Sequence, residues 1–218
     1  MSRTELRAQP LGDSAIAITF GTERSTELLN RIHAAARSLT AAKIPHVDDI
    51  VPAYLSLTIF YDALQTSHRE MAEQLLDACV RISASNTGTA ESRQHHIPVH
   101  YDGIDLAEVA AACALTVEEV IKRHTKRSYA VELLGFVPGF AYMSELDAKL
   151  QLPRRAQPRP RVAAGSVAIA GAQTAVYPLD TPGGWHILGR TETVMFDPSR
   201  EPPALLRPGD TVRFERAK

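Results

Sequence analysis

Three polar side chains in the C-terminal half of the sequence could carry acid–base or anion-binding chemistry: Gln173, His186 and Arg190. They fall in two short segments, 171–178 and 181–190, in which glycines and prolines predict turns between strands. An amide, an imidazole and a guanidinium beside an apolar wall suit a small ligand that bears an amide or an acid group. We therefore take these three as the candidate catalytic residues, with His186 as the acid–base group and Arg190 as the anion clamp.

A second set of residues could bind a substrate or a partner protein. The segment 134–142 (LGFVPGFAY) places aromatic faces beside glycines that let another molecule approach the backbone closely. The segment 152–161 (LPRRAQPRPR) holds four arginines on a chain that its prolines stiffen, which favours binding of carboxylate or phosphate. The candidate binding residues in and around these segments are Pro138, Gly139, Phe140, Tyr142, Arg154, Arg155, Ser166, Tyr177, Gly183, Gly184 and Trp185.

Both segments also have structural interpretations, which the sequence leaves open. The aromatic segment 134–142 could be a buried loop that closes one end of a barrel. The arginines of 152–161 could be solvated, or could pair with acidic side chains inside the same domain.

Several well-known site motifs are missing. Neither GxxxxGK[ST] nor GxGxxG occurs, so ATP, if it is used, is not held by a standard glycine-rich loop. Ser166 lacks the second glycine of a nucleophile elbow and is not expected to be a catalytic nucleophile. His95, His96 and His100 surround Pro98 in an extended segment with no adjoining carboxylate cluster, which favours histidines of a strand. We therefore expect no metal site.

Charge balance and hydropathy narrow the class of protein. Among 218 residues, 24 Lys and Arg oppose 25 Asp and Glu, so no basic field is available for non-specific nucleic-acid binding. No apolar stretch reaches the roughly 20 residues that span a bilayer, and the charged N-terminal residues do not resemble a signal peptide. Cys79 and Cys113 suit two reduced, helix-borne thiols packed in a core. We expect a cytoplasmic protein that binds neither nucleic acid nor membrane.

The elements of the N-terminal part alternate between strand and helix. Residues 14–20 read as a strand, and 47–62 as two short strands that meet near Ala53 and Tyr54, after Pro52. Helical spacing joins Leu28, Ile32, Ala35 and Leu39 on one face, and Met71, Leu75, Ala78 and Ile82 on another. This order resembles a ferredoxin-like or split βαβ unit and predicts a domain at 1–84.

The C-terminal domain, 95–218, is expected to follow a polar, small-residue linker at 85–94. Two short helices are predicted at 106–114 and 117–126, the second with Thr116 as N-cap and Glu119 completing a capping box. Short strands alternate with glycine and proline turns, which is typical of a small barrel or sandwich. The expected strands are 97–101, 129–136, 166–170, 174–177, 185–188, 193–196 and 211–215.

Four unusual motifs resemble those of one protein family. They are GFxPGFxY from 135, LxxPRRxxPR from 150, AGSVAIAGxQT from 164 and TPGGWxxxGRT from 181. In this combination they are similar to the KipI family, also called allophanate hydrolase subunit 1, and the resemblance extends over nearly the whole chain. It implies an α+β protein with a ferredoxin-like N-terminal domain followed by a cyclophilin-like β-barrel domain.

The resemblance also implies a function. Members act as non-autonomous B-type subunits of an ATP-dependent 5-oxoprolinase, which opens 5-oxo-L-proline, a cyclic amide, to L-glutamate. They work together with a paralogous C-type subunit (allophanate hydrolase subunit 2) and an A-type subunit. Two alternatives come from other relatives: a KipI-like inhibitor of a sensor histidine kinase, and a carboxyltransferase-type subunit of a biotin-dependent urea carboxylase. Three positions depart from the family pattern, and they leave the exact substrate open: Glu145, Ala175 and His100.

Overall fold

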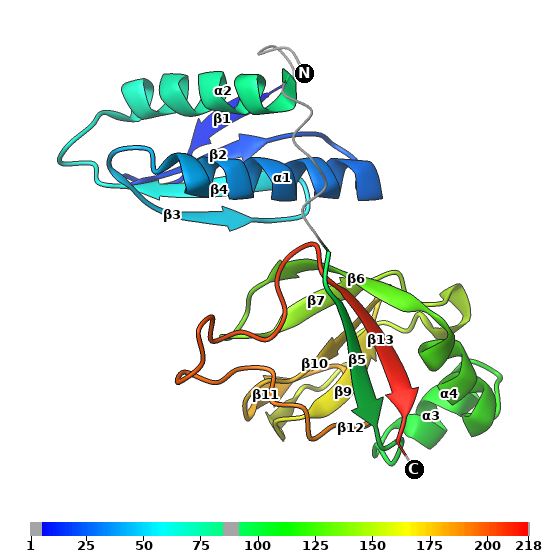
Figure 1. Ribbon diagram of the computed structural model, residues 1–218. Coiled ribbons are helices and arrows are strands. Elements are labelled where there is room, and N and C mark those ends of the chain that lie inside the picture. The colour runs from blue at the N-terminus through cyan, green and yellow to red at the C-terminus, as the bar shows by residue number, and fades with distance from the viewer. Residues whose placement is uncertain (1–5, 85–91, 218) are drawn as a thin grey trace. The chain divides into compact units, whose positions relative to one another are not determined.

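The computed structural model describes residues 6–84 and 92–217, which belong to two compact units, Met1–Glu91 and Ser92–Lys218 (Figure 1). Each unit has its own hydrophobic core. The predicted linker at 85–94 falls largely outside the described residues.

The N-terminal unit is a four-stranded antiparallel sheet with two helices packed on one face. Buried residues alternate along β2 and β4, as Ile16, Ile18, Leu57 and Ile59 do, so one face of the sheet meets the helices. The sheet order is β1-β2-β4-β3, and the elements are β1 (Arg7–Pro10), β2 (Ala15–Thr19), α1 (Thr26–Ala42), β3 (Val47–Pro52), β4 (Ser56–Tyr61) and α2 (His68–Ala84).

The predicted strands and helices of this unit are confirmed, and β2, α1 and β3 form a split βαβ arrangement with β4 between the two parallel strands. Strand β1 was not predicted, because Arg7–Pro10 shows no apolar alternation and ends in proline. It is an edge strand that pairs with β2. Cys79 is buried in α2 as expected, whereas the side chain of Ile82 lies outside the described residues.

The C-terminal unit is built on a seven-stranded sheet in the order β12-β9-β10-β7-β6-β13-β5. An isolated bridge between His100, just beyond β5, and Arg190 in β12 joins the two edges, so the sheet is a nearly closed barrel. Its strands are β5 (Gln94–Val99), β6 (Ser128–Leu134), β7 (Ala141–Ser144), β9 (Ser166–Ala170), β10 (Gln173–Val176), β12 (His186–Arg190) and β13 (Thr211–Arg216). The remaining elements are α3 (Leu106–Ala112), α4 (Val117–Lys126), the short 3-10 helix η2 (Ala148–Leu150) and the strand pair β8 (Arg159–Val162) and β11 (Thr181–Gly183).

The mixed α+β class is confirmed, and so is the capping box of α4, in which Thr116 Oγ1 accepts from the Glu119 amide at 3.2 Å. The strand expected at 193–196 is wrong. That segment makes only one bridge, Phe196 to Ala204, and no ladder. Strands β7, β8 and β11 were missed because each has three or four residues and two of them contain proline, which weakens the strand signal. Cys113 is half-buried at the end of α3.

A buried histidine on α4 connects this helix to the centre of the barrel sheet. His124 accepts a hydrogen bond at Nδ1 from the Tyr101 hydroxyl (2.7 Å), and its Nε2 lies 2.9 Å from Thr174 Oγ1. The Thr174 hydroxyl donates to the Ala168 carbonyl at 3.1 Å, so Nε2 must carry the ring proton. The ring is therefore neutral, and burial lowers the pKa of His124 to about 3.

This lowered pKa predicts acid sensitivity. Between the unfolded pKa of about 6.5 and the folded value, His124 is protonated in the unfolded chain but stays neutral in the folded chain. The free energy of unfolding should therefore fall by about 2 kcal/mol between pH 7 and pH 5, as measured by urea unfolding. His124→Gln keeps a donor and an acceptor. The variant should be less stable at pH 7, but its free energy of unfolding should change less with pH. Equal slopes for the two proteins would contradict the assignment.

Candidate functional site

An aromatic cluster lies against one face of strands β9 and β10, which we call the alanine face after Ala168, Ala170 and Ala175. Phe140 is its centre, and its ring centroid lies 4.9 Å from that of Tyr142, 5.3 Å from that of Tyr177 and 5.6 Å from that of Trp185. Phe140, Tyr177 and Trp185 are only 1%, 1% and 4% exposed, whereas Tyr142 is half-buried. Within this chain, the buried interpretation of 134–142 therefore applies to Phe140, which is covered rather than presented to a partner.

Two glycines lie so close to neighbouring side chains that a larger residue would not fit at either position. Gly139 has a φ of +79°, and a Cβ atom there would lie 2.7 Å from Cβ of Phe196. A Cβ at Gly183 would lie 2.3 Å from the hydroxyl oxygen of Tyr177. Packing within the chain thus accounts for both residues, which the sequence placed among the binding candidates.

Gly183→Ala is expected to lower the free energy of unfolding by roughly 1–3 kcal/mol, because the new methyl group overlaps the Tyr177 hydroxyl. Gly184→Ala is the matched control, since its Cβ would meet its nearest neighbour at 3.7 Å, an ordinary contact. Thermal unfolding of the two variants would check the difference. A Gly183→Ala protein as stable as the control would contradict it.

The three candidate catalytic residues do not converge. Gln173 pairs with Ala170 across β10 and β9, whereas His186 pairs with Ile169 across β12 and β9. Directly paired residues share a face and consecutive residues of a strand alternate, so Gln173 and His186 project to opposite faces of the sheet. Arg190 pairs with Ser166 at the other end of β9.

Each of the three has a partner within the chain. Gln173 Nε2 donates to the Glu132 carboxylate at 2.8 Å. His186 Nε2 donates to the Pro153 carbonyl at 2.9 Å. Arg190 Nε donates to Asp102 at 2.8 Å, and both of these side chains are exposed. The expected pair of His186 and Arg190 is therefore not assembled in this chain.

Glu132, a residue that sequence reasoning missed, lies with Gln173 on the alanine face. It is only 8% exposed and sits at a bulge where β6 pairs with β7. Tyr142 shares this face, because the next residue, Met143, pairs with Thr174 on the opposite side. Glu132 is the one charged residue of the strand Ser128–Leu134, and this was the available signal. The alanine-face site is defined here as Glu132, Tyr142, Gln173, Trp185 and Arg154.

Arg154 is the member of the arginine segment 152–161 that faces this site. Its guanidinium carbon lies 5.9 Å from the centroid of the Trp185 ring, within the range of a cation–π contact. The other three arginines are paired with acids, as the structural interpretation expected. Arg155 and Arg159 bind Asp105, the N-cap residue of α3, at 3.0 and 2.6 Å, and Arg161 Nε donates to Asp180 at 2.8 Å.

Hydrogen bonds and ion pairs shift the pKa values of two of these groups. A hydrogen bond to Glu108, together with the nearby charge of Asp105, raises the pKa of Arg155. The pKa of Asp180 is lowered, first by a hydrogen bond from the Ala164 amide and then by Arg161.

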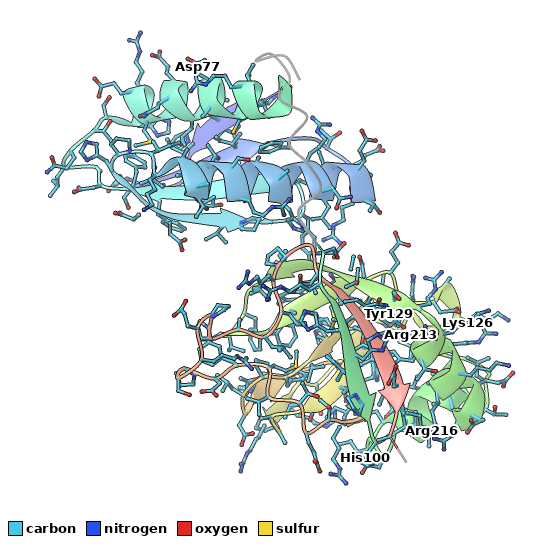
Figure 2. The ribbon with its side chains drawn as sticks, in the orientation of Figure 1. Asp77, His100, Lys126, Tyr129, Arg213 and Arg216 are labelled. Carbon is cyan, nitrogen blue, oxygen red and sulfur yellow. The ribbon has the colours of Figure 1, made fainter. Side chains whose placement is uncertain are left out.

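The remaining positions singled out by sequence are spread over the unit. Ser166 is buried in β9 and Pro138 is exposed. Glu145 is exposed and its carbonyl accepts from Arg127, Ala175 is buried opposite Ala168, and His100 lies at the end of β5 (Figure 2). Across the described residues, no group of three or more His, Cys, Asp or Glu side chains could hold a metal ion, and no helix there is long and apolar enough to cross a membrane.

Comparison with known proteins places the chain in a family. The family model for the carboxyltransferase domain, subdomain C and D, matches residues 6–206. The 5-oxoprolinase B subunit of Bacillus subtilis is 39% identical over 95% of this chain and 91% of that protein, and the one of Escherichia coli is 40% identical over 95% and 94%. A crystal structure of TTHA0988, 43% identical with a TM-score of 0.82, covers 94% of this chain, which spans only 40% of that longer one.

The family match and the nearly closed barrel, preceded by a split βαβ unit, define a chain of the carboxyltransferase type. It belongs to the carboxyltransferase subdomain C and D family, and the resemblance to the KipI or allophanate hydrolase subunit 1 family is confirmed.

Proposed function

We propose that this chain is the B-type subunit of an ATP-dependent 5-oxoprolinase and, with a paralogous C-type subunit and an A-type subunit, opens 5-oxo-L-proline to L-glutamate. One observation carries the proposal: identity of 39% and 40% over 95% of the chain to two proteins named as the B subunit of 5-oxoprolinase. Family members that share so much of their length commonly keep their place in an assembly, and the complex would be a cytoplasmic hetero-oligomer.

The alanine-face site suits part of this chemistry. Tyr142, which is half-buried and packs on Trp185, offers aromatic surface to the apolar ring carbons of a cyclic amide, and Gln173 and Glu132 offer hydrogen-bonding groups to its amide. Arg154, which makes no ion pair among the described residues, can bind the carboxylate of the substrate. Glu132 and Gln173 bind each other, so the carboxylate is held in a fixed orientation on this face.

The finer fold assignment is part of the same proposal. The split βαβ arrangement with an added edge strand supports a ferredoxin-like domain at 1–84. The nearly closed sheet with few parallel pairs supports a cyclophilin-like barrel at 95–218. ATP enters as a substrate of the complex, and we assign no residue of this chain to it.

The test is reconstitution. The chain is co-expressed with its C-type and A-type partners, and glutamate is measured from 5-oxo-L-proline with and without ATP. We expect ATP-dependent glutamate from the full set and none from this chain alone. Glutamate from the isolated chain would refute the dependence on partners, and an inactive but correctly assembled complex would refute the substrate.

A further inference from the structure

Polar atoms around the arginine segment are buried without a hydrogen-bond partner among the described residues. They are Arg155 Nε, Arg159 Nη1 and His186 Nδ1. Leaving a buried donor or acceptor unsatisfied is unfavourable, so such a group is normally completed by a ligand or by ordered water. Three of them on neighbouring elements need a common explanation.

Asp105 holds the two guanidinium groups side by side. Asp105 as a whole residue is 1% exposed, and one of its carboxylate oxygens accepts both from Arg155 Nη1 at 3.0 Å and from Arg159 Nη2 at 2.6 Å. The other oxygen accepts from the backbone amide of Ile187 at 2.7 Å. Each guanidinium group thus uses one nitrogen to bind Asp105 and keeps another buried N–H unused. The bond to the carboxylate fixes the orientation of that unused N–H.

His186 is the neighbour of a residue that binds the same carboxylate, because it immediately precedes Ile187, whose amide donates to Asp105. His186 Nε2 donates to the Pro153 carbonyl, which leaves Nδ1 as the second polar atom of the ring. His186 is 8% exposed, so this atom is not freely hydrated.

We propose that these atoms form a binding site for a small oxyanion, a carboxylate or a phosphate. The unused N–H groups of Arg155 and Arg159 require acceptors, and an anionic oxygen is the acceptor that guanidinium groups bind most strongly. His186 Nδ1 accepts from a ligand that also carries a proton donor, such as the O–H of hydrogen phosphate or the N–H of an amido acid. The site is argued from unpartnered atoms alone and does not depend on the oxoprolinase assignment.

The experiment measures binding to the isolated full-length chain. Inorganic phosphate and 5-oxo-L-proline are titrated calorimetrically, and the expected result is a dissociation constant on the order of 1 mM or tighter for at least one of them. Arg159→Lys keeps a positive charge for Asp105 but loses the forked donors, so it should weaken binding at least tenfold with little loss of stability.

Arg161→Lys is the matched control, because Arg161 lies in the same segment but pairs with the exposed carboxylate of Asp180. It should bind as the wild-type chain does. Binding of phosphate alone or of 5-oxo-L-proline alone supports the site and identifies its ligand. Absence of binding by both, or equal binding by wild type and Arg159→Lys, overturns the proposal and leaves ordered water as the occupant. The result is separable from reconstituted turnover, which requires the partner proteins.

Discussion

Asp105→Ala is expected to lower the free energy of unfolding by about 3–5 kcal/mol, the cost of removing one partner from a buried ion pair. The Asp105 side chain is 2% exposed, and those of Arg155 and Arg159 are 26% and 20% exposed. Without the carboxylate, two guanidinium charges would remain in this poorly hydrated region, and the Ile187 amide would lose its acceptor. Strand β12, the arginine segment and α3 would lose the group that joins them.

Urea unfolding at pH 7 of wild type and variant would measure this loss. Asp102→Ala is the matched control, because Asp102 pairs with Arg190 at the surface, where an ion pair contributes about 0–1 kcal/mol. Asp105→Asn should fall between the two, since its amide oxygen can still accept but carries no charge. An Asp105→Ala protein within about 1 kcal/mol of the control would contradict the role of Asp105 as a buried anchor.

Local signals in the sequence were sufficient for much of the fold. The helical faces of Ile32 and Met71, the capping box at Thr116 and the turn between β3 and β4 depend on near neighbours, and the structure confirms them. Strand β1 and the strands β7, β8 and β11 exist because of pairing with distant segments. Their own residues carry little strand signal, so tertiary contacts decide their conformation.

The candidate site was harder to predict for the same reason. Adjacent motifs suggested that Gln173 and His186 would meet, but the register of β9 with its two neighbours places them on opposite faces. A shift of one residue in the pairing of either neighbour with β9 would place Gln173 and His186 on the same face. Nothing in either motif fixes this register. Glu132 and Asp105 lie 41 and 50 residues before their partners Gln173 and Arg155, so no local spacing could reveal those pairs.

Glu132→Gln is expected to lower kcat of the reconstituted complex at least a hundredfold, if the alanine-face site holds the substrate as proposed. The glutamine has nearly the same shape, and its carbonyl oxygen can still accept from Gln173 Nε2, now 2.8 Å from the carboxylate. The substitution therefore removes the negative charge and the ability to take a proton while leaving the packing in place. An effect confined to kcat would indicate a group that acts on the reacting amide, whereas an effect confined to KM would indicate substrate binding alone.

Glu145→Gln provides the matched control, because Glu145 is exposed and its backbone carbonyl, which the substitution keeps, is the group that binds Arg127. It should leave both kcat and KM close to those of wild type. Gln173→Ala should reduce kcat less than Glu132→Gln does, since the carboxylate survives but loses the amide that orients it. Thermal unfolding of each variant separates lost chemistry from lost structure. If Glu132→Gln turns over 5-oxo-L-proline as fast as Glu145→Gln, the catalytic group of the complex must lie on another protein of the assembly, and the Glu132–Gln173 pair on the alanine face only supports the barrel.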